Sequence, residues 1–128
     1  AIGLAQLKKV DKFISRRREI SKKYDEAFRT ESNIKLLRVD YTSAAPHIYV
    51  IRVRNNLRDP LKQHLKEQDI ETGISYIPNH LHTFYRKHGL SLPETEKAYK
   101  EILTLPLHCK LSDSDVDTVI SSIFEFFN

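Results

Sequence analysis

Cysteine is nearly absent from this sequence of 128 residues. The single cysteine, Cys109, cannot form a disulfide within the chain, and it cannot by itself supply a cysteine-rich zinc site. A secreted scaffold held together by internal disulfides is therefore excluded. We expect the protein to work in the reducing cytoplasm.

Glycine and long apolar runs are scarce as well. The three glycines, Gly3, Gly73 and Gly89, lie too far apart to form a phosphate-binding loop, so a nucleotide-hydrolysing role is not expected. No apolar run approaches the roughly 20 residues that cross a bilayer. The first residues also lack the basic, apolar and small-residue order of a signal peptide. We therefore expect neither export nor a membrane partner.

What remains is the composition of a compact folded protein. Hydrophobic residues make up 40% of the chain and charged residues 30%, and the length suits one domain around one core. The net charge of +4 comes from residues 1–30, which hold nine Lys and Arg against four Asp and Glu. We interpret this basic stretch as a solvated helix face and expect no nucleic-acid partner, because basic charge alone is weak evidence for one.

Hydrophobic spacing predicts the order of the elements. Apolar residues recur at steps of three and four up to Phe28, which predicts one long helix within residues 1–30. Further helices are predicted at 59–68, starting with Asp59 as its cap, at 93–102 and from 112 onward. Strands are predicted at 34–39, 48–53, 71–77 and 103–107.

This order predicts an α+β fold. We expect a small open sheet, antiparallel or mixed, with helices packed on one face and a long N-terminal helix in front of it. Ser112 and Asp115 stand at the spacing of a capping box, which gives the last helix the sharpest start signal in the chain.

Side chains suited to binding cluster in the irregular segment 76–85. Tyr76, Asn79 and His80 offer donors, acceptors and a stacking surface for a hydroxylated ligand or a phosphate. His47, just before the strand at 48–53, is either a further site residue or a strand-ending one. His80 and His82 could share a metal ion, but no third ligand is nearby, so we expect no metal site.

Four stretches carry a resemblance to a known family: AIGLAQLKKVD at 1–11, HIYVIR at 47–52, IETGI at 70–74 and LPLH at 105–108. In this order and spacing they resemble the end of the sugar-nucleotide aminotransferases of the DegT/DnrJ/StrS type, which are fold type I pyridoxal-phosphate enzymes. The resemblance covers essentially the whole chain. It implies that residues 1–128 form one domain, the carboxy-terminal small domain of a larger enzyme, with residues 1–30 as a long connecting helix.

The resemblance also implies what this chain does not contain. In that family a separate large domain carries the lysine that binds pyridoxal phosphate, so we expect no catalytic residue in this fragment, no cofactor bound to it and no activity by it alone. The parent enzyme, expected to be a homodimer, would transfer an amino group from an amino acid, expected to be glutamate, to a nucleotide-linked keto sugar.

The family's substrate-facing loop has the pattern tyrosine, any residue, proline, variable residue, histidine, which matches residues 76–80. By this resemblance His80 and Tyr76 are the first candidates for substrate contact, followed by Asn79 and His47. An equal alternative is that His80 and Tyr76 only brace the loop. Asp69 stands where relatives usually have a glycine, which is acceptable if Asp69 adopts a left-handed conformation.

A different class of function stays open beside this one. The chain could be a stand-alone α+β module that binds a small molecule or a regulatory partner without catalysis, and fold alone does not exclude this. The coding sequence immediately before Ala1 separates the two hypotheses, because it either contains a lysine-bearing domain or does not.

Overall fold

The structure, a computed structural model, describes residues 2–85 and 90–128. Its centre is a three-stranded antiparallel sheet in the order β1-β2-β3, formed by β1 (Ile34–Leu36), β2 (Tyr49–Val53) and β3 (Ile102–Leu105). The alternating side chains of β2 bury Tyr49, Ile51 and Val53 on one face. This face belongs to the core.

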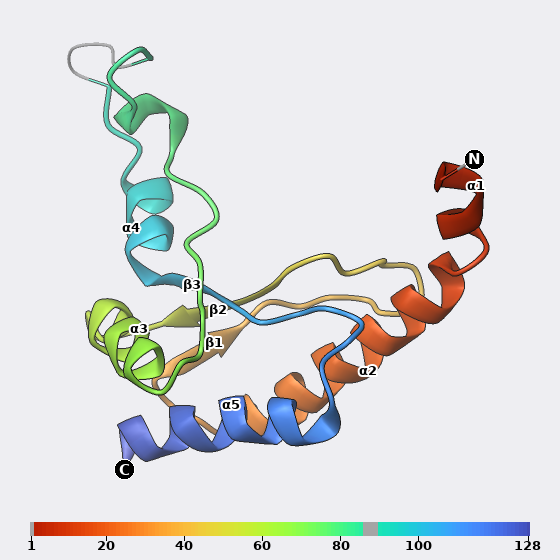
Figure 1. The fold of residues 1–128 in the computed structure, drawn as a ribbon. Helices are drawn as coiled ribbons and strands as arrows, with labels where there is room; N and C mark the ends of the chain where they lie inside the picture. The colour runs from red at the N-terminus through yellow and green to blue at the C-terminus, as the bar shows by residue number, and fades with distance from the viewer. Residues whose placement is uncertain (1, 86–89) are drawn as a thin grey trace.

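Helices α2 (Val10–Phe28), α3 (Arg58–Glu67) and α5 (Asp113–Phe127) bury their apolar sides in the same core, with α2 and α5 running beneath the sheet (Figure 1). Helix α4 (Pro93–Glu101) leads directly into β3. Its Glu101 forms an ion pair of 2.6 Å with Arg52, whose side chain lies on the face of β2 opposite the core. The predicted α+β class and small open antiparallel sheet are confirmed.

The predicted N-terminal helix is interrupted. Helix α1 (Ile2–Leu7) is followed by a turn at Lys8 and Lys9 before α2 begins, although the turn contains neither Gly nor Pro. No residue of α1 is buried, and the first buried residue of α2 is Ile20. Burial in the core therefore begins only in the second half of α2, which periodicity alone could not reveal.

The strand predicted at 71–77 is wrong. Only Gly73 forms backbone bonds with the sheet, donating to the carbonyl of Thr104 at 3.0 Å and accepting from its N–H at 2.8 Å. Continued antiparallel pairing would set the residues after Ser75 against α4, whose N–H groups bond within the helix. The chain therefore leaves the sheet edge there.

The start of α3 also differs from the prediction, whereas its end agrees. Asp59 is the second residue of the helix and makes an ion pair of 2.6 Å with Arg58 rather than capping it; the N-cap is Leu57, which has no side-chain oxygen. At the other end Asp69 has a φ of 58°, the left-handed conformation under which an aspartate is acceptable there, and the Ile70 N–H bonds to the Leu65 carbonyl. This closes a Schellman motif.

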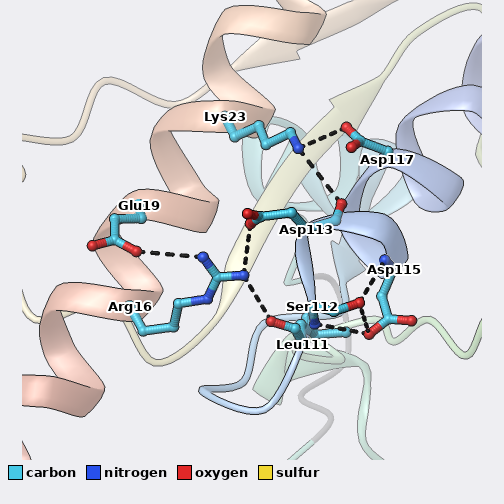
Figure 2. A network of polar contacts seen from close by, with 8 residues as sticks. All are labelled: Arg16, Glu19, Lys23, Leu111, Ser112, Asp113, Asp115 and Asp117. Carbon is cyan, nitrogen blue, oxygen red and sulfur yellow. Dashed lines mark hydrogen bonds and ion pairs between the residues drawn. The ribbon is translucent and has the colours of Figure 1, made fainter.

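The start of α5 is held by its own cap and by α2. Ser112 and Asp115 form the predicted capping box, with the Asp115 N–H donating to the Ser112 Oγ at 3.1 Å. From α2, Arg16 donates to the Leu111 carbonyl and to Asp113, each at 2.8 Å (Figure 2). Lys23 reaches the same turn and pairs with Asp117 at 2.7 Å.

Part of the basic surface of α2 is therefore structural rather than merely solvated. Arg16 and Lys23 join α2 to α5, and the Nε of Arg18 donates to the carbonyl of Ala44 at 2.8 Å. Lys12 and Lys22 remain exposed. In the part of the chain that the structure describes, no helix has the length and apolar character needed to cross a membrane.

Candidate functional site

The candidate binding segment projects from the sheet. We call residues 74–85 the arm: they leave the edge of β3 after Gly73 and run alongside and beyond α4, away from α2 and α5 (Figure 1). The arm contains one 3-10 turn, η1 (Asn79–Leu81). The irregular segment predicted at 76–85 is therefore confirmed.

The arm exposes large aromatic side chains. Tyr76 is 77% exposed and Phe84 88%, and the Phe84 ring meets Tyr85 edge to face with centroids 5.0 Å apart. Exposed aromatic groups of this size are unusual on a solvated surface and are typical of places that contact a ligand or another protein surface. Asn79 is exposed at the start of η1.

His80 differs from its neighbours because it is buried. Its Nε2 lies 3.1 Å from the Oε1 of Glu96 in α4, and the same oxygen accepts the N–H of Leu92 at 3.0 Å. The Leu92 amide, followed by His80, lowers the pKa of the Glu96 carboxyl. An ionised Glu96 thus anchors both the turn of the arm and the start of α4.

His47 lies at the other end of the sheet. It precedes β2, whose first residue Tyr49 pairs with Leu105, whereas the chain after Gly73 runs toward the opposite end of β3. There His47 lines a pocket of about 220 Å³ between α2 and the segment 37–50. The structure therefore brings Tyr76, Asn79 and His80 together on the arm and separates His47 from them.

That pocket contains polar groups that sequence reasoning missed. Tyr49 donates its hydroxyl to the Oδ1 of Asp25 at 2.7 Å, and Ser21 and Tyr41 line the same space. Ser21 and Asp25 are four residues apart on α2 and so lie on one side of the helix. The spacing was a usable signal, but the helix was predicted from its apolar residues alone.

A larger open groove of about 620 Å³ lies elsewhere, between residues 68–73, the end of β3 and the first half of α5. It contains none of the four candidate residues. In the described ranges 2–85 and 90–128, no group of three or more His, Cys, Asp and Glu side chains is arranged to hold a metal ion.

Comparison with known proteins matches this chain to one family. The profile of the DegT/DnrJ/EryC1/StrS aminotransferase family aligns with residues 1–124. The chain belongs to this family. The earlier resemblance is therefore confirmed.

Individual relatives of this DegT/DnrJ/EryC1/StrS family member give the same result. The dTDP-4-dehydro-2,3,6-trideoxy-D-glucose 4-aminotransferase of Saccharopolyspora spinosa is 35% identical over 93% of this chain and 31% of its own length. The aminotransferase TlmJ of Streptoalloteichus hindustanus superposes with a TM-score of 0.86 at 34% identity, over 98% of this chain and 35% of TlmJ.

A third relative was solved in a cofactor-bound state. Spr1654 of Streptococcus pneumoniae, described as a proposed sugar aminotransferase and solved in its PMP form, has a TM-score of 0.83 and 32% identity, over 97% of this chain and 33% of its own. The chain thus spans about a third of the length of the relatives it matches.

Proposed function

We propose that residues 1–128 form one domain, the carboxy-terminal small domain of a pyridoxal-phosphate-dependent aminotransferase. Its parent would move an amino group from an amino acid, glutamate, to a keto sugar linked to a nucleotide. The main support is the family match over residues 1–124 of a chain that spans only a third of its relatives. The name of the Saccharopolyspora relative supports the sugar-nucleotide class.

The side chains of this fragment do not fit the cofactor. Pyridoxal phosphate, when bound to such an enzyme, supplies the electron sink for amino transfer, and the protein must offer a lysine with lowered pKa in a dry pocket. No lysine in the described part of the chain is buried, and Lys35 on β1 is exposed. We therefore propose that another part of the parent holds the cofactor and that this chain alone is inactive.

The arm is the proposed contribution of this domain to the substrate side of the cleft. Tyr76 and Asn79 have exposed side chains on one short segment, which suits contact with a sugar or its nucleotide. The burial of His80 against Glu96 supports a positioning role for it. His47 lies away from the arm, and we propose a separate binding role for it below.

The proposal extends to the environment of the parent. The free, half-buried thiol of Cys109 suits a reducing cytoplasm. By analogy with the family, we propose a homodimeric parent that uses no nucleic-acid or membrane partner.

The decisive experiment joins genetics and spectroscopy. We expect the coding sequence before Ala1 to encode a lysine-bearing domain, and the longer protein to bind pyridoxal phosphate and transfer an amino group from glutamate to a nucleotide-linked keto sugar. The purified 128-residue chain should show neither the cofactor's bound absorbance nor turnover. Turnover by the short chain, or a gene that begins at these residues, would contradict the proposal.

Kinetic measurements on variants of the arm then test whether the arm forms the substrate side of the cleft. In the longer protein Tyr76→Ala should raise KM for the keto sugar more than KM for the amino donor, because only the sugar half-reaction uses the arm. Thr83→Ala, an exposed change on the same arm, is the matched control. Equal effects of Tyr76→Ala on both substrates would remove the arm from the substrate side.

A further inference from the structure

The pocket beside His47 has one wall that is held in place by hydrogen bonds. This outer wall is the segment 40–46, which is held by hydrogen bonds within the segment and by Arg18 of α2. Asp40 accepts hydrogen bonds from the Thr42 N–H at 2.9 Å and its hydroxyl at 2.7 Å, while Arg18 holds the carbonyls of Ala44 and Thr42. A wall tied by these bonds keeps its shape without a ligand.

The inner surface of this pocket presents hydrogen-bond acceptors around one carboxylate. The Oδ1 of Asp25 already accepts the Tyr49 hydroxyl. No ion pair to Asp25 exists among the residues the structure describes, although Arg29 lies one helical turn away and lines a neighbouring groove with it. The carboxylate therefore retains capacity for a cationic donor.

Ser21 adds the observation that points to a ligand. Its side chain is fully buried, it lines the pocket, and no hydrogen bond to its Oγ is found among the described residues. A buried hydroxyl without a partner is unfavourable in a folded protein, and such atoms are rare. An occupant of the pocket that donates a hydrogen bond would satisfy it.

The two phenols keep their protons in this environment. Burial, followed by the nearby Asp25, raises the pKa of Tyr49 and of Tyr41 well above the ordinary tyrosine value. The Ser21 hydroxyl is near enough to Tyr41 to lower that pKa by a smaller amount, yet no hydrogen bond of normal geometry joins them. Neutral phenols offer oxygen lone pairs and ring faces, both of which attract a cation.

We propose that this pocket binds a primary ammonium group. The positive group would bond to Asp25 and Ser21, with Tyr41 and Tyr49 beside it and the apolar Leu37, Val39 and Ile48 around its carbon chain. The pocket volume of about 220 Å³ lies below that of sites for drug-sized ligands, which suits the end of an alkylamine. A free amine and a lysine side chain share this chemistry.

The site is independent of the proposed aminotransferase role, because it lies at the other end of the sheet from the arm. It can be tested in the 128-residue chain by two-dimensional NMR. Titration with n-propylammonium chloride should shift the amides of Ser21, Asp25 and His47 with saturation. Uncharged n-propanol, of nearly the same shape, should bind at least tenfold more weakly.

Variants assign the binding to the named atoms. Asp25→Asn should weaken n-propylammonium at least tenfold, whereas Asp11→Asn, the same change outside the pocket, should not. Ser21→Ala should weaken binding several-fold while raising the melting temperature of the free chain, since it removes the unpartnered hydroxyl. If Asp25→Asn does not fold, the binding of n-propylammonium to Ser21→Ala alone tests the proposed site.

Two results would overturn the site: shifts no larger than those caused by sodium chloride at the same ionic strength, or unchanged binding by Ser21→Ala and a folded Asp25→Asn. Binding of a second ligand shows whether the ammonium group belongs to a lysine side chain or to a small free amine. Nα-acetyl-lysine methylamide binding at least tenfold more tightly than n-propylammonium assigns the site to a lysine side chain; equal or weaker binding assigns it to a small free amine.

Discussion

The Nε2 of buried His80 lies 3.1 Å from the Oε1 of Glu96, and this contact ties the arm to helix α4. Because the same oxygen also accepts the Leu92 N–H, one carboxylate holds two segments that are far from each other along the chain. The arm is therefore positioned by a side chain outside it.

Removing this carboxylate should loosen the arm without unfolding the core. We expect Glu96→Ala to raise hydrogen exchange at the amides of η1 and of Leu92 several-fold, because both lose their anchor. Glu96→Gln, which keeps an acceptor oxygen, should have a smaller effect. Glu94→Ala, an exposed change in the same first turn, is the control; an equal response to it would show that the effect is a helix-dipole effect.

Acid should weaken the start of α5. Hydrogen bonds from the Ser112 side chain and backbone lower the pKa of Asp115 below 3.8. A depressed folded-state pKa means that this contribution to stability is fully present above pH 3.8 and is lost as the pH falls through the folded value. Urea unfolding should therefore show Asp115→Asn less stable than the parent chain at pH 7, with the gap closing toward pH 2; a constant gap would contradict the assignment.

Arg16 should contribute measurably to stability because it bonds a backbone carbonyl as well as a carboxylate. Arg16→Met keeps much of the aliphatic stem but loses the bonds to Leu111 and Asp113 shown in Figure 2. We expect a loss of about 1 kcal/mol in urea unfolding. Arg38→Met, at an exposed position, should change stability by less than about 0.5 kcal/mol. Equal losses would mean that Arg16 acts only through its stem.

Asp69 offers a stabilising substitution. Its φ of 58° lies in the left-handed region, where a side chain costs about 1 to 2 kcal/mol for most residues and glycine has no such penalty. Asp69→Gly should raise the free energy of unfolding by up to about 1 kcal/mol, and Asp69→Ala should not raise it. A stabilising alanine would show that the backbone conformation is not the cause.

The sequence predicted those features whose causes are local. The capping box at Ser112 and strand β2 both depend on a few neighbouring residues, and both were predicted correctly. The segment 71–77 was predicted wrongly because its β-rich composition does not reveal that only Gly73 has a strand beside it. Sheet partners are set by the whole fold.

The candidate site divides in the same way. The cluster from Tyr76 to His80 could be read from consecutive residues, and the structure keeps it together on one arm. The role of Glu96 could not be predicted in this way, because its contact with His80 spans sixteen positions. Its place in the first turn of α4 also gave its charge a sufficient explanation. The pocket between α2 and residues 37–50 likewise exists only after folding.

None of the residues of helix α1 is buried in the core. Ile2, Leu4 and Leu7 are each more than 60% exposed, and a helix of six residues is far too short to persist on its own. Cooperative melting of the sheet and its three covering helices therefore gives no information about this segment. The helical circular dichroism signal of residues 2–7, or the mobility of a spin label attached there, would instead report whether another protein surface binds that end of the chain.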